Sequence, residues 1–364
     1  MLTSLLKKFI TWYESRERLL SSLSLIGGFV FDAITLQRVD EFWENVWVIA
    51  HILGAAICII IINRRGQPKT SEELDMKHFW LLMTMQFMFG GLLSTFLVFY
   101  YRSASLLVSW PFILILIIAF AANERLRKHY ERVTFQISFL YLSLFSFAIF
   151  IVPVLTHQIG KSIFLLSGLL SLIALYGFLI ILRRFAPSAF EESKRLLAIS
   201  IFGIWMTFHF LYFFNIIPPL PLALKDSGMY HTLQKNSDGS YIGTKEKESW
   251  TRLFKIYEDF HATAGQTLYA YSAIFSPTNL NTGVVHEWQF YDEARSAWIT
   301  QSTISLRVVG GREDGYRTYS QKSLYAEGKW RVNVQTSGGQ TIGRIYFNII
   351  EVAVAPELLM VVKS

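Results

Sequence analysis

The chain has 364 residues, of which 52% are hydrophobic and only 17% are charged, against about 25% charged residues in typical soluble proteins. This composition argues strongly against a wholly soluble enzyme and a disordered chain, and the single cysteine, Cys58, argues against a disulfide scaffold. The net charge is +7; residues 1–216 hold 19 basic and 13 acidic side chains, and residues 217–364 hold 15 and 14. The basic excess thus belongs to the apolar half, as in membrane proteins with cationic cytoplasmic loops, and no nucleic-acid partner is expected.

Seven apolar stretches approach the length of about 20 residues that crosses a ~30 Å hydrocarbon core. They cover residues 19–36, 45–63, 78–101, 104–122, 134–155, 161–182 and 196–216. The loops on one side hold 16 Lys and Arg residues and those on the other side hold 3. This split predicts a cytoplasmic amino terminus, seven crossings and an outer carboxyl half. We expect the first stretch to be retained, because no small-residue cleavage site follows it.

The membrane domain is predicted to span residues 1–216, because three prolines follow it: Pro218, Pro219 and Pro221. Residues 217–262 form a connecting segment, in which a loop with one hairpin precedes an amphipathic helix at 246–262. That helix is predicted from apolar residues at helical spacing, namely Trp250, Leu253, Phe254, Tyr257 and Phe260. It could lie on the lipid surface or on the neighbouring domain.

Residues 263–364 are predicted to form an all-β domain, because apolar and polar residues alternate with period two. The pattern is clearest around Trp288, Leu306, Trp330 and Phe347, and turn-rich breaks separate the segments. Six or seven short strands with a buried Trp favour an immunoglobulin-like antiparallel sandwich. No cysteine pair supports a closer relation to that fold.

Three segments resemble a family of bacterial multi-pass envelope proteins, whose two halves are known only as domains of unknown function. They are GGFVFDAITLQRVD at 27–40, PPLPLALKDSGMYH at 218–231, and a tail with His286-Glu287-Trp288 and residues 310–347. The resemblance covers nearly the whole chain, and the tail is its most specific part. It implies a Gram-negative inner-membrane location and a small periplasmic β domain. It implies no reaction.

Sequence motifs give no positive sign of an enzyme. We find no G-x-S-x-G, H-E-x-x-H, P-loop or G-x-G-x-x-G pattern. A Cys-based metal site cannot be built with one cysteine. We therefore predict no catalytic residue, metal ligand or cofactor and favour a non-enzyme, while absent motifs leave the question of an enzyme open.

Four polar residues lie in or beside the apolar stretches: Asp32, Arg38, His51 and His209. Ionisable groups at membrane depth are costly and are candidates for ion or proton handling. Asp32 could instead pair with Arg38 near the outer end of its helix. The two histidines could form a pair between helices, or each could simply hydrogen-bond within the bundle.

One surface of the β domain is a candidate binding site. Its predicted members are Arg307, Arg317, Tyr319, Arg331, Arg344 and Tyr346, which alternate with core residues. Arg and aromatic side chains are enriched at recognition surfaces, and Arg suits phosphate and carboxylate groups. The ordinary alternative is a solvated face with charge pairs.

Two hypotheses of different classes follow. The first is an envelope protein whose outer domain binds or scaffolds another envelope membrane protein, a second copy, a glycan or a lipid head group, with the helices embedded in the bilayer. The second is a membrane transporter or intramembrane enzyme that uses Asp32, His51 and His209.

Overall fold

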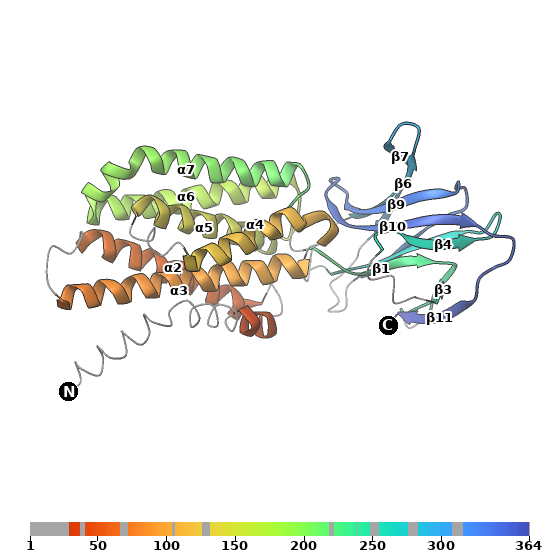
Figure 1. The fold of residues 1–364 in the computed structure, drawn as a ribbon, viewed down its shortest axis with the longest axis horizontal. Helices are drawn as coiled ribbons and strands as arrows, with labels where there is room; N and C mark the ends of the chain where they lie inside the picture. The colour runs from red at the N-terminus through yellow and green to blue at the C-terminus, as the bar shows by residue number, and fades with distance from the viewer. Residues whose placement is uncertain are drawn as a thin grey trace. The chain divides into compact units, whose positions relative to one another are not determined.

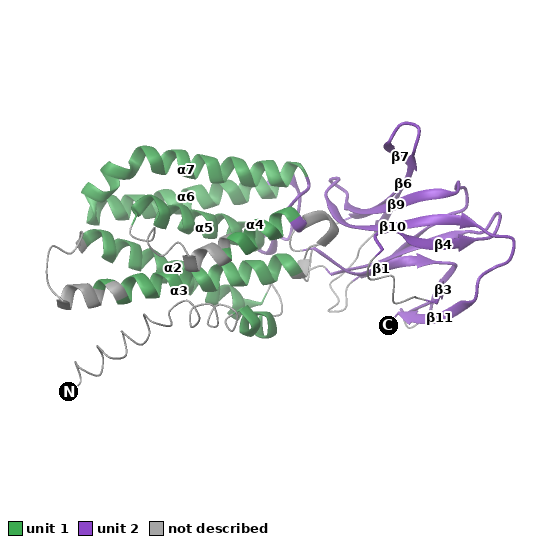
Figure 2. Ribbon diagram, in the orientation of Figure 1, with its two compact units in different colours: residues 1–102, 111–152, 163–214 green, residues 103–110, 153–162, 215–364 purple. Residues whose placement is uncertain are grey.

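The computed structural model describes residues 29–36, 41–65, 72–103, 106–125, 132–217, 222–237, 239–247, 255–275, 283–307 and 316–363. The chain divides into two compact units, coloured separately in Figure 2. The helical unit comprises Met1–Arg102, Pro111–Val152 and Ile163–Phe214. The β unit comprises Ser103–Trp110, Pro153–Ser162 and Asn215–Ser364.

Six long helices coincide with the second to seventh predicted stretches (Figure 1). They are α2 (Phe42–Arg65), α3 (Glu72–Ser103), α4 (Leu106–Arg125), α5 (Val133–Thr156), α6 (Lys161–Phe185) and α7 (Pro187–Phe213). Of the first predicted stretch, residues 29–35 are helical and residues 19–28 lie outside the described part. Among the described residues, α2, α3, α5, α6 and α7 are long and apolar enough to cross a membrane. The protein is therefore a membrane protein by length and composition of its helices.

The helical unit is held together by aromatic packing between helices. Phe164 of α6 stacks on Tyr212 of α7 with ring centroids 3.7 Å apart, and Phe145 of α5 stacks on Phe208 of α7 at 4.6 Å. Large apolar side chains also cover the outside of the helices, as Leu169 does with 54% of its surface exposed. Helices that are apolar on all sides are typical of membrane spans.

The β unit contains eleven strands among the described residues. They are β1 (Ala223–Tyr230), β2 (Thr232–Lys235), β3 (Tyr241–Glu246), β4 (Glu258–Ala262), β5 (Leu268–Phe275), β6 (Gly283–Asp292), β7 (Ala297–Arg307), β8 (Tyr316–Lys322), β9 (Gly328–Thr336), β10 (Thr341–Glu351) and β11 (Leu358–Lys363). They form a central sheet β1-β5-β8, a five-stranded sheet β4-β10-β9-β6-β7 and a third sheet β11-β3-β2.

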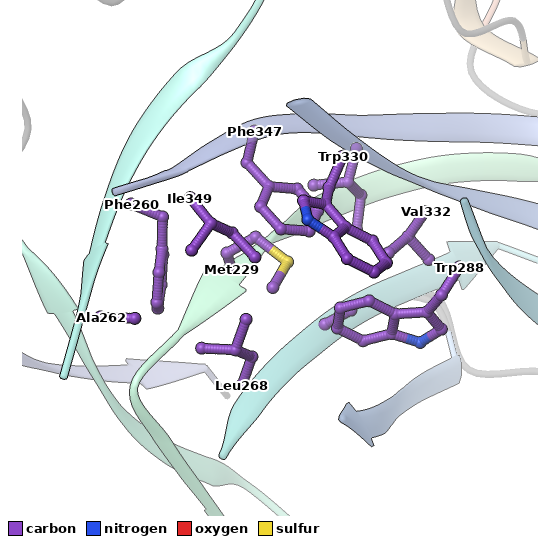
Figure 3. Close-up of a cluster of buried hydrophobic side chains, with 11 residues drawn as sticks. Met229, Phe260, Ala262, Leu268, Trp288, Trp330, Val332, Phe347 and Ile349 are labelled. Carbon is purple, nitrogen blue, oxygen red and sulfur yellow. The ribbon is translucent and has the colours of Figure 1, made fainter. Parts of the chain in front are cut away.

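The main core lies between the central sheet and the five-stranded sheet (Figure 3). Met229 and Leu268 of the central sheet pack in one cluster with Trp288, Trp330 and Phe347 of the five-stranded sheet. The alternation predicted for these strands is confirmed, since these three aromatic residues are buried and their sequence neighbours point away.

The opposite face of the central sheet packs on the third sheet. Its Tyr230 and Tyr271 share a second cluster with Leu233 of β2 and Tyr241 of β3. The strands thus form three layers, where the sequence predicted a two-sheet antiparallel sandwich. The difference arises because segments outside the predicted strands, at 223–246 and 358–363, form β1, β2, β3 and β11. The hairpin expected in the connecting segment is present as β2 and β3, which pair antiparallel.

The prediction of an amphipathic helix at 246–262 is wrong. Glu246 ends strand β3, and Glu258–Ala262 forms strand β4, which pairs parallel to β10; residues 248–254 lie outside the described part. Phe260 and Ala262 are buried in the core, while His261 between them is only half-buried. A helix would forgo the backbone hydrogen bonds that the edge of β10 offers.

Candidate ligand-binding face

The side of the five-stranded sheet that points away from the core carries polar and aromatic side chains. We call it the outward face, and it comprises Glu287, Gln289, Tyr291, Trp298, Thr300, Arg331, Asn333, Gln335, Arg344 and Tyr346. These residues belong to β6, β7, β9 and β10. Since successive side chains of a strand point to opposite faces, the same alternation that builds the core also builds this face.

A carboxylate lies at the centre of the outward face. Glu287 accepts hydrogen bonds from Asn333 Nδ2 (2.9 Å), Gln335 Nε2 (3.0 Å) and Thr300 Oγ1 (2.8 Å). Burial raises the pKa of Glu287, but these hydrogen bonds outweigh it and the net pKa lies below the ordinary value. The carboxylate is therefore ionised at neutral pH, and its partners are held in fixed positions.

Two arginines beside this carboxylate are held by amides. Arg331 Nε donates to Gln289 Oε1 (2.7 Å), and Arg344 Nε donates to Asn333 Oδ1 (3.0 Å). Burial first, and then the charge of Arg344, lower the pKa of Arg331. Within the described residues neither guanidinium forms an ion pair with a carboxylate. The face thus has positive charge that its own side chains only partly balance.

Four aromatic rings extend in a row across the outward face and its edge. The ring centroids are 5.5 Å apart between Tyr257 and Tyr346, 6.4 Å between Tyr346 and Trp298, and 5.1 Å between Trp298 and Tyr291. The Arg331 guanidinium lies over the Trp298 ring, 4.3 Å from its centroid. All four rings are half-buried. They are anchored in the sheet and still present part of their surface to a ligand.

Five of the six predicted binding residues are described with their side chains, and they lie in two different sheets. Arg331, Arg344 and Tyr346 lie on the outward face. Tyr319 belongs to β8 of the central sheet and packs against Tyr241 of the third sheet, and Arg317 lies two residues before it, on the same side of β8. Arg307 ends β7 opposite Gly283, and its side chain is outside the described part.

Sequence reasoning missed several members of the face, namely Glu287, Gln289, Trp298 and Asn333, and it also missed Tyr257 at its edge. The strand alternation contained the signal for the four members, because positions that face away from a core share one side of the sheet. Tyr257 was assigned to a helix, so its contact with Tyr346 could not be foreseen.

The intramembrane histidines repeat one local arrangement. His51 Nδ1 lies 2.9 Å from the Trp47 carbonyl oxygen, and His209 Nδ1 lies 2.8 Å from the Trp205 carbonyl oxygen. Each imidazole also packs on that Trp ring, at 4.4 and 3.9 Å between centroids. The W-x-x-x-H spacing, present twice, is the sequence signal for this arrangement.

A neighbouring glycine accommodates each imidazole. A Cβ on Gly91 of α3 would lie 2.9 Å from His51 Cδ2, and one on Gly168 of α6 would lie 3.3 Å from His209 Cε1. No contact between the two histidines is found among the described residues, so the structure supports no His pair. The His51 Nε2 atom is buried and has no hydrogen-bond partner among the described residues.

Asp32 is buried close to the first of these histidines. The residue is 9% exposed, and its carboxyl group interacts with His51 and with the Ser94 side chain of α3. The predicted pairing partner, Arg38, lies outside the described residues. The structure therefore brings together two of the four intramembrane candidates, Asp32 and His51.

A polar pocket of about 340 Å³ lies elsewhere in the β unit, along β1, β3, β4 and the end of β11. Glu246 lines it and binds two histidines: its carboxylate oxygens lie 2.7 Å from His261 Nδ1 and 3.3 Å from His231 Nε2. Burial lowers the pKa of His231, although Glu246 acts in the opposite direction. No group of three or more His, Cys, Asp or Glu side chains in the described ranges is arranged to hold a metal ion.

Comparison with known proteins places a family match within the β unit. A family model described as a protein of unknown function, DUF2914, matches residues 281–349. These residues include β6 to β10 and thus most of the outward face. The carboxyl-terminal domain is accordingly similar to a domain of unknown function, as the sequence resemblance implied.

Other comparisons add no functional information. A search of the curated proteins finds no match to this chain. Among solved structures, the alkylpurine DNA glycosylase AlkC of Pseudomonas fluorescens, bound to DNA with an abasic site analog, aligns over 86% of this chain and 99% of its own. The sequence identity is 8% and the TM-score is 0.20, so this likeness carries no argument about fold or activity.

Proposed function

We propose that this protein is a non-enzymatic envelope protein of the bacterial inner membrane that binds a partner through the outward face of its β unit. The observation that carries the proposal is the row of half-buried aromatic rings beside two arginines without an ion-paired carboxylate among the described residues. Aromatic and Arg side chains dominate binding energy at recognition surfaces. A merely solvated sheet face needs no such row.

We further propose seven crossings, with a cytoplasmic amino terminus and a periplasmic β unit. Two observations support this topology: the 16-to-3 division of basic residues between alternate loops and the five apolar helices. The proposed immunoglobulin-like sandwich corresponds to the central sheet and the five-stranded sheet, which pack together around Trp288. The helices of the protein would lie in the bilayer. The partner bound by the β unit would be another envelope protein, a second copy of this chain, a glycan or a lipid head group.

Site-specific photo-crosslinking of the full-length protein in cells tests the binding face. A photoreactive amino acid replaces Tyr346 on the outward face, and the control position is Lys235, which is exposed on β2 of the third sheet. We expect an adduct at position 346 that Arg331→Ala reduces, and none at 235. Equal adducts at both positions, or none at 346, would rule out this face as the binding site.

A second function is favoured by the burial of Asp32 beside His51, whose Nε2 atom is buried and without a hydrogen-bond partner among the described residues. We propose as an alternative that this site handles protons or ions within a transporter or intramembrane enzyme, with His209 as a separate candidate. Asp32→Asn and His51→Gln would then abolish function while Arg331→Ala would leave it intact. The binding hypothesis predicts the reverse result.

A further inference from the structure

We propose that the outward face binds an acidic oligosaccharide, an inference that rests on the proposed binding function and specifies its ligand. Three properties of the face lead to this ligand class: a row of half-buried rings, a hydrogen-bonded network that fixes two arginines, and positive charge that is only partly balanced. The rings suit the apolar sides of sugar rings, and the fixed arginines suit the acidic groups of the chain.

The aromatic row offers a series of separately inclined ring surfaces to a sugar chain, since neighbouring rings are tilted by 74°, 67° and 57°. Tyr257, Tyr346, Trp298 and Tyr291 follow one another at centroid distances of 5.5, 6.4 and 5.1 Å. The C–H groups on one side of a pyranose ring are apolar and pack well against an aromatic ring. Because the row is longer than one sugar, we expect it to bind a chain of sugars rather than a single one.

A polar network in the sheet holds the two arginines of the face in position for a ligand. Glu287, Gln289 and Asn333 hold one another at 2.9 to 3.1 Å, so their positions are fixed before a ligand arrives. Gln289 and Asn333 are buried, and their side-chain oxygens hold Arg331 and Arg344. The N–H groups of these two half-buried guanidinium groups are therefore the donors available to a sugar hydroxyl. Pre-organised groups lower the entropic cost of binding.

The charge of the face selects an acidic sugar over a neutral one. Arg331 and Arg344 are close enough for each charge to affect the other, and an anionic ligand would relieve this repulsion. Arg binds carboxylate and phosphate groups in a charge-assisted way. A nucleic acid, with a charge on every phosphate, fits less well, because the carboxyl half has a net charge of only +1.

Binding of defined oligosaccharides to the full-length protein in nanodiscs tests this inference. The probes are oligogalacturonate, its neutral methyl ester, and a phosphorylated lipopolysaccharide core oligosaccharide with its dephosphorylated form. These pairs keep the sugar chain and remove the charge, and they separate a carboxylate ligand from a phosphate ligand. We expect at least one acidic member to bind about tenfold more tightly than its neutral counterpart.

Variants of the face complete the test. Trp298→Ala and Arg331→Gln should each weaken binding of the acidic sugar about tenfold, while Lys235→Ala on the third sheet should not change it. Circular dichroism shows whether the β unit remains folded, and Arg344→Gln replaces any variant that does not fold. Dextran sulfate is a control for simple polyanion attraction, and Trp298→Ala should leave its weak binding unchanged.

The outcomes distinguish this inference from the proposed function on which it rests. If no acidic oligosaccharide binds, or if Trp298→Ala has no effect on its binding, the glycan inference is overturned. If in that case the crosslink at position 346 persists and still depends on Arg331, the binding function stands with a protein or lipid ligand. If the crosslink is absent as well, both proposals are overturned.

Discussion

The guanidinium of Arg331 lies over the indole of Trp298, 4.3 Å from the ring centroid, although the two residues belong to β9 and β7 with β6 between them. The Nε hydrogen bond to Gln289 holds the guanidinium in this position. The contact therefore links three strands of the five-stranded sheet and fixes the centre of the aromatic row.

A double-mutant cycle should detect this contact as a coupling of about 1 kcal/mol, the usual value for a partly exposed cation–π pair. The variants are Arg331→Met, Trp298→Leu and the double variant. Hydrogen exchange of β9 amides in the full-length protein measures the local free energy of opening. Additive effects would show that the contact contributes nothing to stability. Lys235→Met on β2 of the third sheet, paired with Trp298→Leu, serves as the uncoupled reference.

Acid should destabilise the β unit through His286. This imidazole lies 2.8 Å from Ser272 Oγ and 2.8 Å from Ser320 Oγ, and burial lowers its pKa to about 4. An unfolded histidine titrates near 6.5, so the unfolded state binds the proton first as the pH falls. The contribution of neutral His286 to the free energy of unfolding is therefore complete well above pH 6.5. It decreases by about 3 kcal/mol as the pH falls to 4.

Unfolding of wild type and His286→Gln at pH 7.5, 6 and 5 checks this prediction. The variant is less stable at pH 7.5, because buried hydrogen bonds are lost, but its stability falls less steeply with acid. The buried His231, whose pKa is also lowered, adds the same acid destabilisation in wild type and in the variant. The difference between their slopes of unfolding free energy against pH therefore isolates the effect of His286. Parallel slopes would contradict the assignment.

The sequence predicted four strands of the five-stranded sheet well, namely β6, β7, β9 and β10, because one face of each is buried. Val284, His286 and Trp288 of β6 are all fully buried, and they alternate with the less buried Val285, Glu287 and Gln289. The segment at 246–262 was mispredicted because Tyr257 and Phe260 also fit helical spacing. What decides its conformation is the edge of β10, about 90 residues later in the chain, which no local pattern reveals.

The candidate site was predicted in part for a similar reason. Alternation assigns Arg331 and Arg344 to the side of their strands that faces away from the core, and this was correct. Alternation does not say which sheet a strand joins, so Arg317 and Tyr319 were wrongly grouped with them. In the membrane, a pair between His51 and His209 was one of two alternatives. The structure instead has each imidazole within hydrogen-bond distance of a backbone carbonyl of its own helix and beside a different glycine.

Gly91→Ala should destabilise the helical unit. The added methyl group would lie 2.9 Å from His51 Cδ2, and the imidazole cannot easily move because Nδ1 is hydrogen-bonded to the Trp47 carbonyl. Overpacking of this kind costs about 1–3 kcal/mol. Thermal unfolding in detergent should show a lower midpoint for this variant.

Two further variants make the glycine test specific. Gly177→Ala in α6 is the matched control, because a Cβ added there would meet no neighbouring atom within 4 Å, and it should be neutral or slightly stabilising. His51→Ala combined with Gly91→Ala should recover part of the loss, since the clash is removed. An equal loss in Gly177→Ala would show that the effect is not due to contact with His51.

Cysteine labelling tests the proposed topology, and the chain is well suited to it because Cys58 is its single cysteine and is buried. In a Cys58→Ala background, Ala294→Cys introduces a thiol in the exposed turn between β6 and β7, and Ser188→Cys introduces one in the exposed first turn of α7. A membrane-impermeant maleimide should label position 294 in intact cells, because the β unit is proposed to be periplasmic. Position 188 lies between the sixth and seventh predicted stretches, in a segment rich in Lys and Arg, and should react only after the inner membrane is lysed. Labelling at 188 but not at 294 in intact cells would reverse the orientation, and the outward face would then have to bind a cytoplasmic ligand.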